Sequence, residues 1–277
     1  MSEASYHITI KPQKGWMGIN FKEIWLYREL FYIFVWRDIK VRYKQTAIGI
    51  LWAILQPFLM MMIFSFVFGR LAKIPSNDIP YPVFVFAGLL FWNYFSSAIT
   101  NASNVLVEQE SMVKKIYFPR LILPISSSLT PLVDFCIAFV ILLGLTAYYH
   151  YVPNIFGILM IPLLLLLAFV SAAGIGFFLS AINVKYRDIR HALPFFIQIL
   201  LFVTPVIYPA SIIDAKYQWI LALNPMTGII EAVRSLLFQN TPIDIPLFLI
   251  SMTSGIVLFL FGIFYFRKTE RFFADIV

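Results

Sequence analysis

The sequence predicts an all-α polytopic membrane protein that forms a single transmembrane domain over residues 1–277. Hydrophobic residues make up 61% of the chain and charged residues 13%, whereas about a quarter of an ordinary soluble domain is charged. A membrane-spanning helix needs about 20 mainly apolar residues. Six windows meet this requirement: 48–68, 82–107, 121–149, 156–182, 192–208 and 245–266.

The positions of the basic residues predict how these six helices are oriented. If the amino terminus is cytoplasmic, 17 of the 21 Lys and Arg residues lie on the cytoplasmic side. The positive-inside rule then places both termini in the cytoplasm, in agreement with the even number of spans. The net charge of +7 therefore indicates topology and attraction to anionic phospholipids. No nucleic-acid-binding motif competes with this interpretation.

Residues 22–46, ahead of the first span, predict an interfacial amphipathic helix. Basic side chains share one helical face: Arg37, Lys40 and Lys44. Apolar side chains share the opposite face: Ile24, Phe31, Val35 and Ile39. Arg42 falls on the apolar side, where its long stem can reach the headgroups. This pattern is typical of a helix that lies on lipid, and a soluble cytosolic helix is the alternative.

Residues 108–119, between the second and third spans, predict a short amphipathic helix in the cytoplasm. The charged residues of this connection are Glu108, Glu110, Lys114, Lys115 and Arg120. Apolar residues alternate with them: Val113, Ile116, Tyr117 and Phe118. Pro119 ends the helix, because the residue before a proline avoids the helical conformation. A solvated turn with stray apolar residues is the alternative.

Residues 217–238, before the last span, predict a re-entrant helical hairpin. Two apolar stretches are interrupted at Asn224 and Pro225, and broken backbone at membrane depth must be surrounded by protein or by a water-filled cavity. Glu231 and Arg234 are three residues apart, so they can neutralise one another there. Alternatively, the pair lies at the outer membrane interface.

Aromatic and polar residues inside the spans suggest a passage for a glycan. Rings offer flat apolar faces to sugars, and amides exchange hydrogen bonds with hydroxyl groups. The candidate lining residues are Phe91, Trp92, Tyr94, Phe95, Asn101, Asn104, Gln198, Phe202 and Tyr208. Most aromatic residues in spans face lipid or form interfacial belts, which is the alternative for any one ring. Asp134, a carboxylate deep in a span, is by default a functional candidate, and a structural hydrogen bond explains it equally well.

Motifs of enzymatic chemistry are absent from the sequence. It contains no phosphate-binding loop, no histidine–carboxylate cluster and no Gly-x-Ser-x-Gly element. We therefore expect neither a metal site nor a cofactor in this chain. A membrane glycosyl- or acyltransferase would need convergent acids or histidines, and a secondary transporter would need repeats with paired broken helices.

Several short motifs, in order along nearly the whole chain, resemble the membrane subunits of bacterial ABC polysaccharide exporters, which handle O-antigens, capsules and teichoic acids. The matching segments are 37–46 (RDIKVRYKQT), 49–52 (GILW), 56–57 (QP), 114–120 (KKIYFPR), 186–189 (YRDI), 204–208 (TPVIY) and 224–226 (NPM). Each motif is weak by itself, but their order on a six-span frame is specific.

The resemblance implies a homodimeric channel in the bacterial inner membrane, driven by two separate ATPase subunits that use Mg-ATP. The 108–119 helix would be the coupling helix, with Glu108, Glu110, Lys114, Lys115, Tyr117, Phe118 and Arg120 at the ATPase. The interfacial helix would frame the entry of an undecaprenyl-type lipid-linked glycan, its pyrophosphate bound by Arg37, Lys40, Arg42 and Lys44. The 217–238 hairpin would help to close the external end. A drug or lipid exporter of the same fold is the alternative.

Overall fold

The computed structural model describes residues 25–44, 49–239, 242–270 and 273, and over these residues the protein is helical, with no β-strand. Residues 22–24 and 45–46 of the predicted interfacial helix, Ile24 included, lie outside the described residues. The helices are α2 (Arg28–Lys44), α3 (Gly49–Phe64), α4 (Tyr81–Glu108), α5 (Glu110–Lys115), α6 (Ile122–Leu129), α7 (Leu132–Tyr148), α8 (Ile155–Lys185), α9 (Ile189–Val203), α10 (Ala215–Ala222), α11 (Pro225–Arg234) and α12 (Ile245–Glu270). Shorter π- and 3₁₀-helical segments are η1 (Ser65–Leu71), η2 (Ala210–Ile212) and η3 (Ser235–Gln239).

Within this part of the chain, five helical runs are long and apolar enough to cross a membrane, or six if one bent pair is counted as a span. They are Leu51–Leu71, Tyr81–Glu108, Ile122–Tyr148, Ile155–Lys185 and Ile245–Glu270. The bent pair is Ala215–Ala222 with Pro225–Phe238, and its two halves meet at 111°. The all-helical, polytopic fold class is thus confirmed, and the chain does break where Asn224 and Pro225 predict.

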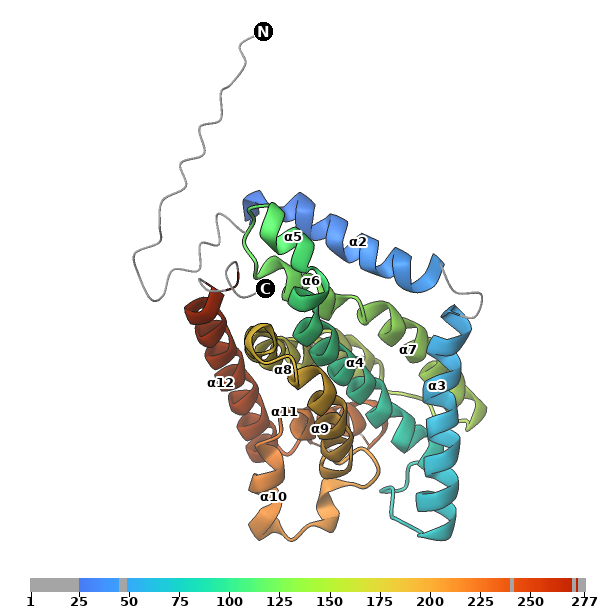
Figure 1. Ribbon diagram of the computed structural model, residues 1–277. Helices are drawn as coiled ribbons and strands as arrows, with labels where there is room; N and C mark the ends of the chain where they lie inside the picture. The colour runs from blue at the N-terminus through green and yellow to red at the C-terminus, as the bar shows by residue number, and fades with distance from the viewer. Residues whose placement is uncertain (1–24, 45–48, 240–241, 271–272, 274–277) are drawn as a thin grey trace.

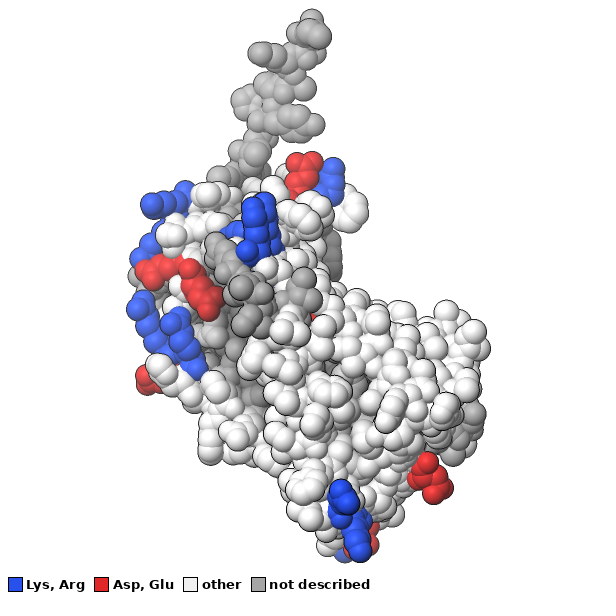
Figure 2. Space-filling model, turned by 90° about the vertical axis from the view of Figure 1, so that its right-hand side faces the viewer, with Lys and Arg blue, Asp and Glu red and all other residues white. Residues whose placement is uncertain are grey.

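Helix α4 lies at the centre of the bundle and packs against α3, α6, α7, α8, α9 and α11. Helix α2 lies across one end of the bundle beside α5 and α6, whereas α10 lies at the opposite end (Figure 1). We call these the α2 end and the α10 end. Charged side chains gather at the two ends, and a wide band between them is almost free of charge in Figure 2. This band is the surface that a lipid bilayer would cover.

Helices α8 and α12 approach each other so closely that their backbones touch. A Cβ atom on Gly262 would overlap the carbonyl oxygen of Gly174, and one on Gly174 would overlap the backbone of Phe259. Small residues of this kind allow close helix packing where the hydrophobic effect cannot drive association. Glycine at these two positions therefore determines how α8 and α12 fit together.

The structure differs from the predicted boundaries at three places. Helix α9 ends at Val203 after 15 residues, not at residue 208, because Thr204 precedes a proline and takes an extended conformation. The third predicted span is divided into α6 and α7, with the break before Pro131. The coupling segment is helical only over α5, and Glu108 is the last residue of α4.

Candidate functional site

Asp134, in the first turn of α7, ties the end of α2 to the bundle. Its Oδ2 atom is 2.6 Å from Nη2 of Arg42, and its Oδ1 atom accepts a hydrogen bond from the hydroxyl of Tyr43. Burial, followed by this hydrogen bond, raises the pKa of Tyr43, so the phenol stays protonated and remains a donor. Both carboxylate oxygens are engaged, which supports the structural interpretation of Asp134.

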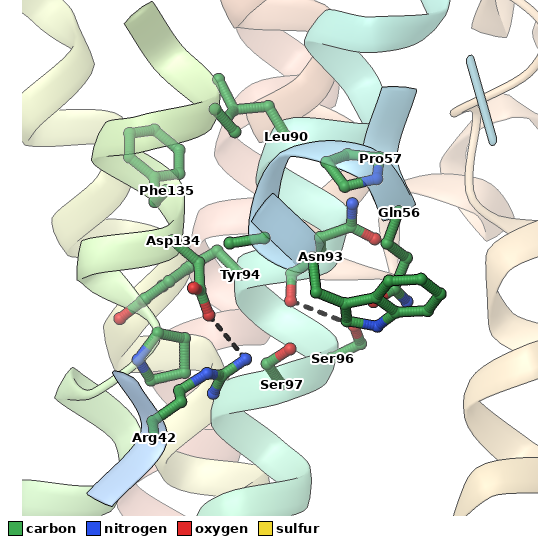
Figure 3. Close-up of a pocket in the computed structure, with 14 residues that line it drawn as sticks. Arg42, Gln56, Pro57, Leu90, Asn93, Tyr94, Ser96, Ser97, Asp134 and Phe135 are labelled. Atoms are coloured by element: carbon green, nitrogen blue, oxygen red, sulfur yellow. Dashed lines mark hydrogen bonds and ion pairs between the residues drawn. The ribbon is translucent and has the colours of Figure 1, made fainter. Parts of the chain in front are cut away.

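A cavity of about 420 Å³ opens beside this ion pair, between α3, α4 and the start of α7 (Figure 3). Its wall includes Trp52 and Gln56 from α3 and Asn93 and Ser97 from α4. Among the described residues, the side chains of Gln56, Asn93 and Ser97 have no hydrogen-bond partner. The cavity wall therefore offers two amides and a hydroxyl that form no hydrogen bond, next to an exposed indole.

The predicted channel residues fall into separate groups, and one protomer does not bring them together. Phe91, Trp92, Tyr94 and Phe95 of α4 are buried, and Phe91 and Tyr94 contact the ring of Phe135 edge-on. Within a single copy of the chain, therefore, these four rings form a helix contact and not a passage. Of the four, Tyr94 also reaches the cavity wall.

The polar members of the predicted channel set are likewise engaged in packing, except on α9. Asn101 donates a hydrogen bond to the carbonyl of Ser127 at 3.5 Å, and Asn104 accepts one from Asn183 at 3.2 Å. Three remaining residues belong to α9 or follow it: Gln198, Phe202 and Tyr208. Gln198 and Phe202 are exposed, whereas the Tyr208 hydroxyl bonds back to the carbonyls that end the helix.

The predicted coupling segment separates into an exposed tip and buried anchors. Lys114, Lys115, Ile116 and Tyr117 are exposed, as is Glu108 at the end of α4. Phe118 is buried instead and packs edge-on against Phe34 of α2, with ring centroids 5.8 Å apart. Arg120 donates to the backbone carbonyl of Glu270 at 2.6 Å. Phe118 and Arg120 therefore hold the segment in place, and only the tip is available to a partner.

Charged side chains link α5 to the loop between α8 and α9. Lys114 lies 2.7 Å from Glu110, and its hydrogen bond lowers the pKa of that carboxyl. Arg187 approaches the other oxygen of Glu110 to 3.9 Å. The two connections thus form one charged surface at the α2 end.

The four basic residues predicted to bind the lipid carrier do not share a surface. Arg37 turns inward, where it pairs with Asp38 at 2.8 Å and donates to Gln109 at 3.3 Å. Arg42 pairs with Asp134, as described above. Lys40 and Lys44 are exposed. Helical periodicity alone could not show that Arg37 and Arg42 are drawn to partners inside the protein, because Gln109 and Asp134 are distant in the sequence.

Arg234 of α11 is buried at the α10 end, not exposed at an interface. It is 1% exposed and donates to the carbonyls of Pro205 and Val206 at 2.7 Å each. It also donates to the carbonyl of Phe84 at 3.3 Å, lies over that ring, and pairs with Glu231 at 3.0 Å. Arg234 therefore joins α11 to α4 and to the segment after α9. The sequence indicated the Glu231 pair but not these carbonyls.

The apolar helices and the band that is almost free of charge define an integral membrane protein. Residues 29–238 match the family model described as "ABC-2 type transporter". Because this match covers most of the chain, the protein belongs to the ABC-2 transporter membrane family.

Similar proteins within this family carry names that refer to polysaccharides. The chain is 28% identical to the O-antigen export system permease protein RfbA of Klebsiella pneumoniae over 249 residues, 90% of this chain and 95% of that one. It is 28% identical to RfbA of Myxococcus xanthus over 259 residues, 92% and 98% of the two chains. It is 25% identical to the polysialic acid transport protein KpsM of Escherichia coli over 205 residues, 72% and 77%.

Proposed function

We propose that this chain is the channel-forming permease subunit of an ATP-driven exporter that moves a lipid-linked, O-antigen-like polysaccharide across the inner membrane. The main support is the similarity to O-antigen export permeases over 90% or more of the chain, within a family of transport subunits. The chain is thus a transport subunit, and hydrolysis of Mg-ATP belongs to a separate partner.

The α2 end faces the cytoplasm in this proposal, with both termini on that side. The exposed, described Lys and Arg residues belong to α2, α5, residues 185–190 around the connection between α8 and α9, and the end of α12, with three exceptions. Arg70 lies in η1, Lys73 just after it, and Lys216 in α10. This asymmetry agrees with the positive-inside rule and with attraction of α2 to anionic phospholipids. The exposed tip 114–117 then projects toward the ATPase, as a coupling element must.

Two copies of the chain and two ATPase subunits form the exporter that we propose. Helices α3 and α9 each expose large apolar side chains along most of their length, so a second copy has apolar surface to pack against. The bent pair α10–α11 acts as the re-entrant hairpin that helps to close the outer end. Lys40 and Lys44, two exposed members of the predicted cationic set, contact the pyrophosphate of the incoming lipid carrier.

The decisive experiment is gentle extraction of the chain from its native membrane after mild crosslinking, followed by identification of every stoichiometric partner. We expect a nucleotide-binding subunit in a one-to-one ratio, and loss of surface polysaccharide in cells that lack the chain. A homomer without an ATPase, recovered with its assembly preserved, would refute the proposal. ATPase activity stimulated by small drugs and not by glycan would instead favour a drug exporter.

A further inference from the structure

We propose that the cavity between α3, α4 and α7 binds one neutral sugar ring of the exported glycan. This inference rests on the proposed function, and it assigns one part of the substrate to one set of residues. Four observations carry it: polar groups without hydrogen-bond partners, an exposed indole, a neutralised ion pair and the size of the cavity.

The polar groups of the cavity lie inside two candidate membrane spans. Gln56 belongs to Leu51–Leu71, and Asn93 and Ser97 belong to Tyr81–Glu108. A polar group without a hydrogen-bond partner is costly at this depth, because no bulk water is available to satisfy it. Across the described residues, the amides of Gln56 and Asn93 and the hydroxyl of Ser97 form no such bond. They are therefore available to a ligand that both donates and accepts hydrogen bonds, as sugar hydroxyls do.

Trp52 supplies a flat apolar face to the same cavity. It is 56% exposed and forms part of the wall on α3. An aromatic ring with polar groups around it is suited to a ligand that has one apolar face and a polar edge. A pyranose ring has this division, because its C–H bonds crowd one face and its hydroxyls radiate from the edge.

The electrostatics of the cavity favour a neutral group over a phosphate. Arg42 is the basic residue of the wall, and Asp134 lies 2.6 Å from it and belongs to the same wall. The two charges neutralise each other, so a phosphate that entered would meet the carboxylate as well as the guanidinium. Like charges that meet at a binding surface disfavour association.

The size of the cavity fits a single sugar ring. About 420 Å³ is near the lower end of the roughly 300–1,000 Å³ found for small-molecule sites, so the cavity suits a single ring better than a length of polymer. Arg42 faces this cavity from the last turns of α2, whereas Lys40 and Lys44 lie on the opposite face of that helix.

The test uses the full chain with its copurifying partners in phospholipid nanodiscs. Cys136 is replaced by Ser, and a reporter cysteine is introduced in the cavity wall as Ala53→Cys, or outside it as Ala147→Cys, which is exposed on α7. Alkylation by a maleimide is timed in the presence of octyl β-D-glucoside below its micellar concentration. Octyl phosphate and octyl tetraethylene glycol carry the same alkyl chain without a sugar, and serve as the two comparison probes.

Octyl glucoside should slow alkylation at Ala53→Cys at least threefold and leave Ala147→Cys unchanged, while neither comparison probe protects. Gln56→Leu or Asn93→Leu should raise the half-protecting concentration about three- to tenfold, the effect of one lost neutral hydrogen bond. Asn77→Gly, which removes an exposed amide from the loop between η1 and α4, should have no effect.

Equal protection by octyl phosphate would assign the cavity to a phosphate, from a lipid headgroup or a carrier, and would overturn the proposal. Absence of protection by the glucoside would overturn it too. The proposed function is assessed separately, by ATPase copurification and surface polysaccharide. An intact exporter without protection would refute the sugar site alone, and protection without an ATPase would refute the exporter alone.

Discussion

Replacement of Arg234 by Met should strongly destabilise the fold, because this side chain satisfies three carbonyls and one carboxylate inside the bundle. Methionine keeps much of the length and the contact with the Phe84 ring, but it removes all four polar contacts. Single hydrogen bonds within membranes average about 0.6 kcal/mol, so three of them account for about 2 kcal/mol. The unpaired Glu231 adds to this loss, since removing one partner of a buried ion pair costs about 3–5 kcal/mol. Because Glu231 is 21% exposed, the lower end of that range applies, and we expect a total loss of about 5 kcal/mol in the free energy of unfolding.

The assay is reversible unfolding by sodium dodecyl sulfate in bicelles, followed through helix content, for wild type and variants under identical conditions. Arg70→Met is the matched control, because Arg70 lies at the same end of the bundle but is exposed, and exposed substitutions change stability by about 0.5 kcal/mol or less. The double variant Arg234→Met, Glu231→Gln should recover part of the loss, since it removes the uncompensated charge. A loss below about 1 kcal/mol for Arg234→Met, on the scale of those single hydrogen bonds, would show that the carbonyls find other donors and that Arg234 is not a structural joint.

Three further substitutions test other parts of the molecule. Lys114→Glu with Lys115→Glu should reduce ATPase copurification at least fivefold at normal membrane levels, because charge reversal at an interface disfavours docking; unaltered copurification would contradict the coupling role. Asp134→Asn should lower stability by about 1 kcal/mol, as expected for a partly exposed ion pair; an unchanged midpoint of unfolding would show that the pair with Arg42 does not hold α2 to the bundle. Gly262→Leu should cost at least about 1–3 kcal/mol of stability through overpacking against α8, and an unchanged midpoint of unfolding would show that α12 can move aside.

The long spans could be predicted from the sequence because one local property, a sustained apolar run, determines them. The window 82–107 corresponds to α4, Tyr81–Glu108, and the window 245–266 to the greater part of α12, Ile245–Glu270. The residue at which α9 ends could also have been predicted from the neighbouring sequence. Thr204 precedes Pro205, and the residue before a proline avoids the helix, but the apolar residues beyond it extended the window to 208.

The orientation of individual side chains could not be predicted, because partners far apart in the sequence decide it. Arg37 pairs with Gln109, 72 residues away, and the helical period placed it on a surface that it does not occupy. Arg234 bonds to Phe84, 150 residues away, and no local pattern points to that carbonyl. The sequence was equally uninformative for the aromatic residues of α4, because the same residue types occur in contacts between helices and in the lining of a passage.

The backbone contact between α8 and α12 provides a fixed reference for measurements on the working exporter. Helices that touch at Gly174 and Gly262 cannot rotate or slide without collision, so two spectroscopic labels, one on each helix, should keep a constant separation throughout turnover. Labels on α3 or α9, whose outer faces contact no other described part of the chain, can then be measured against that pair. Motion of the transport pathway would thus be separated from rotation of the whole subunit.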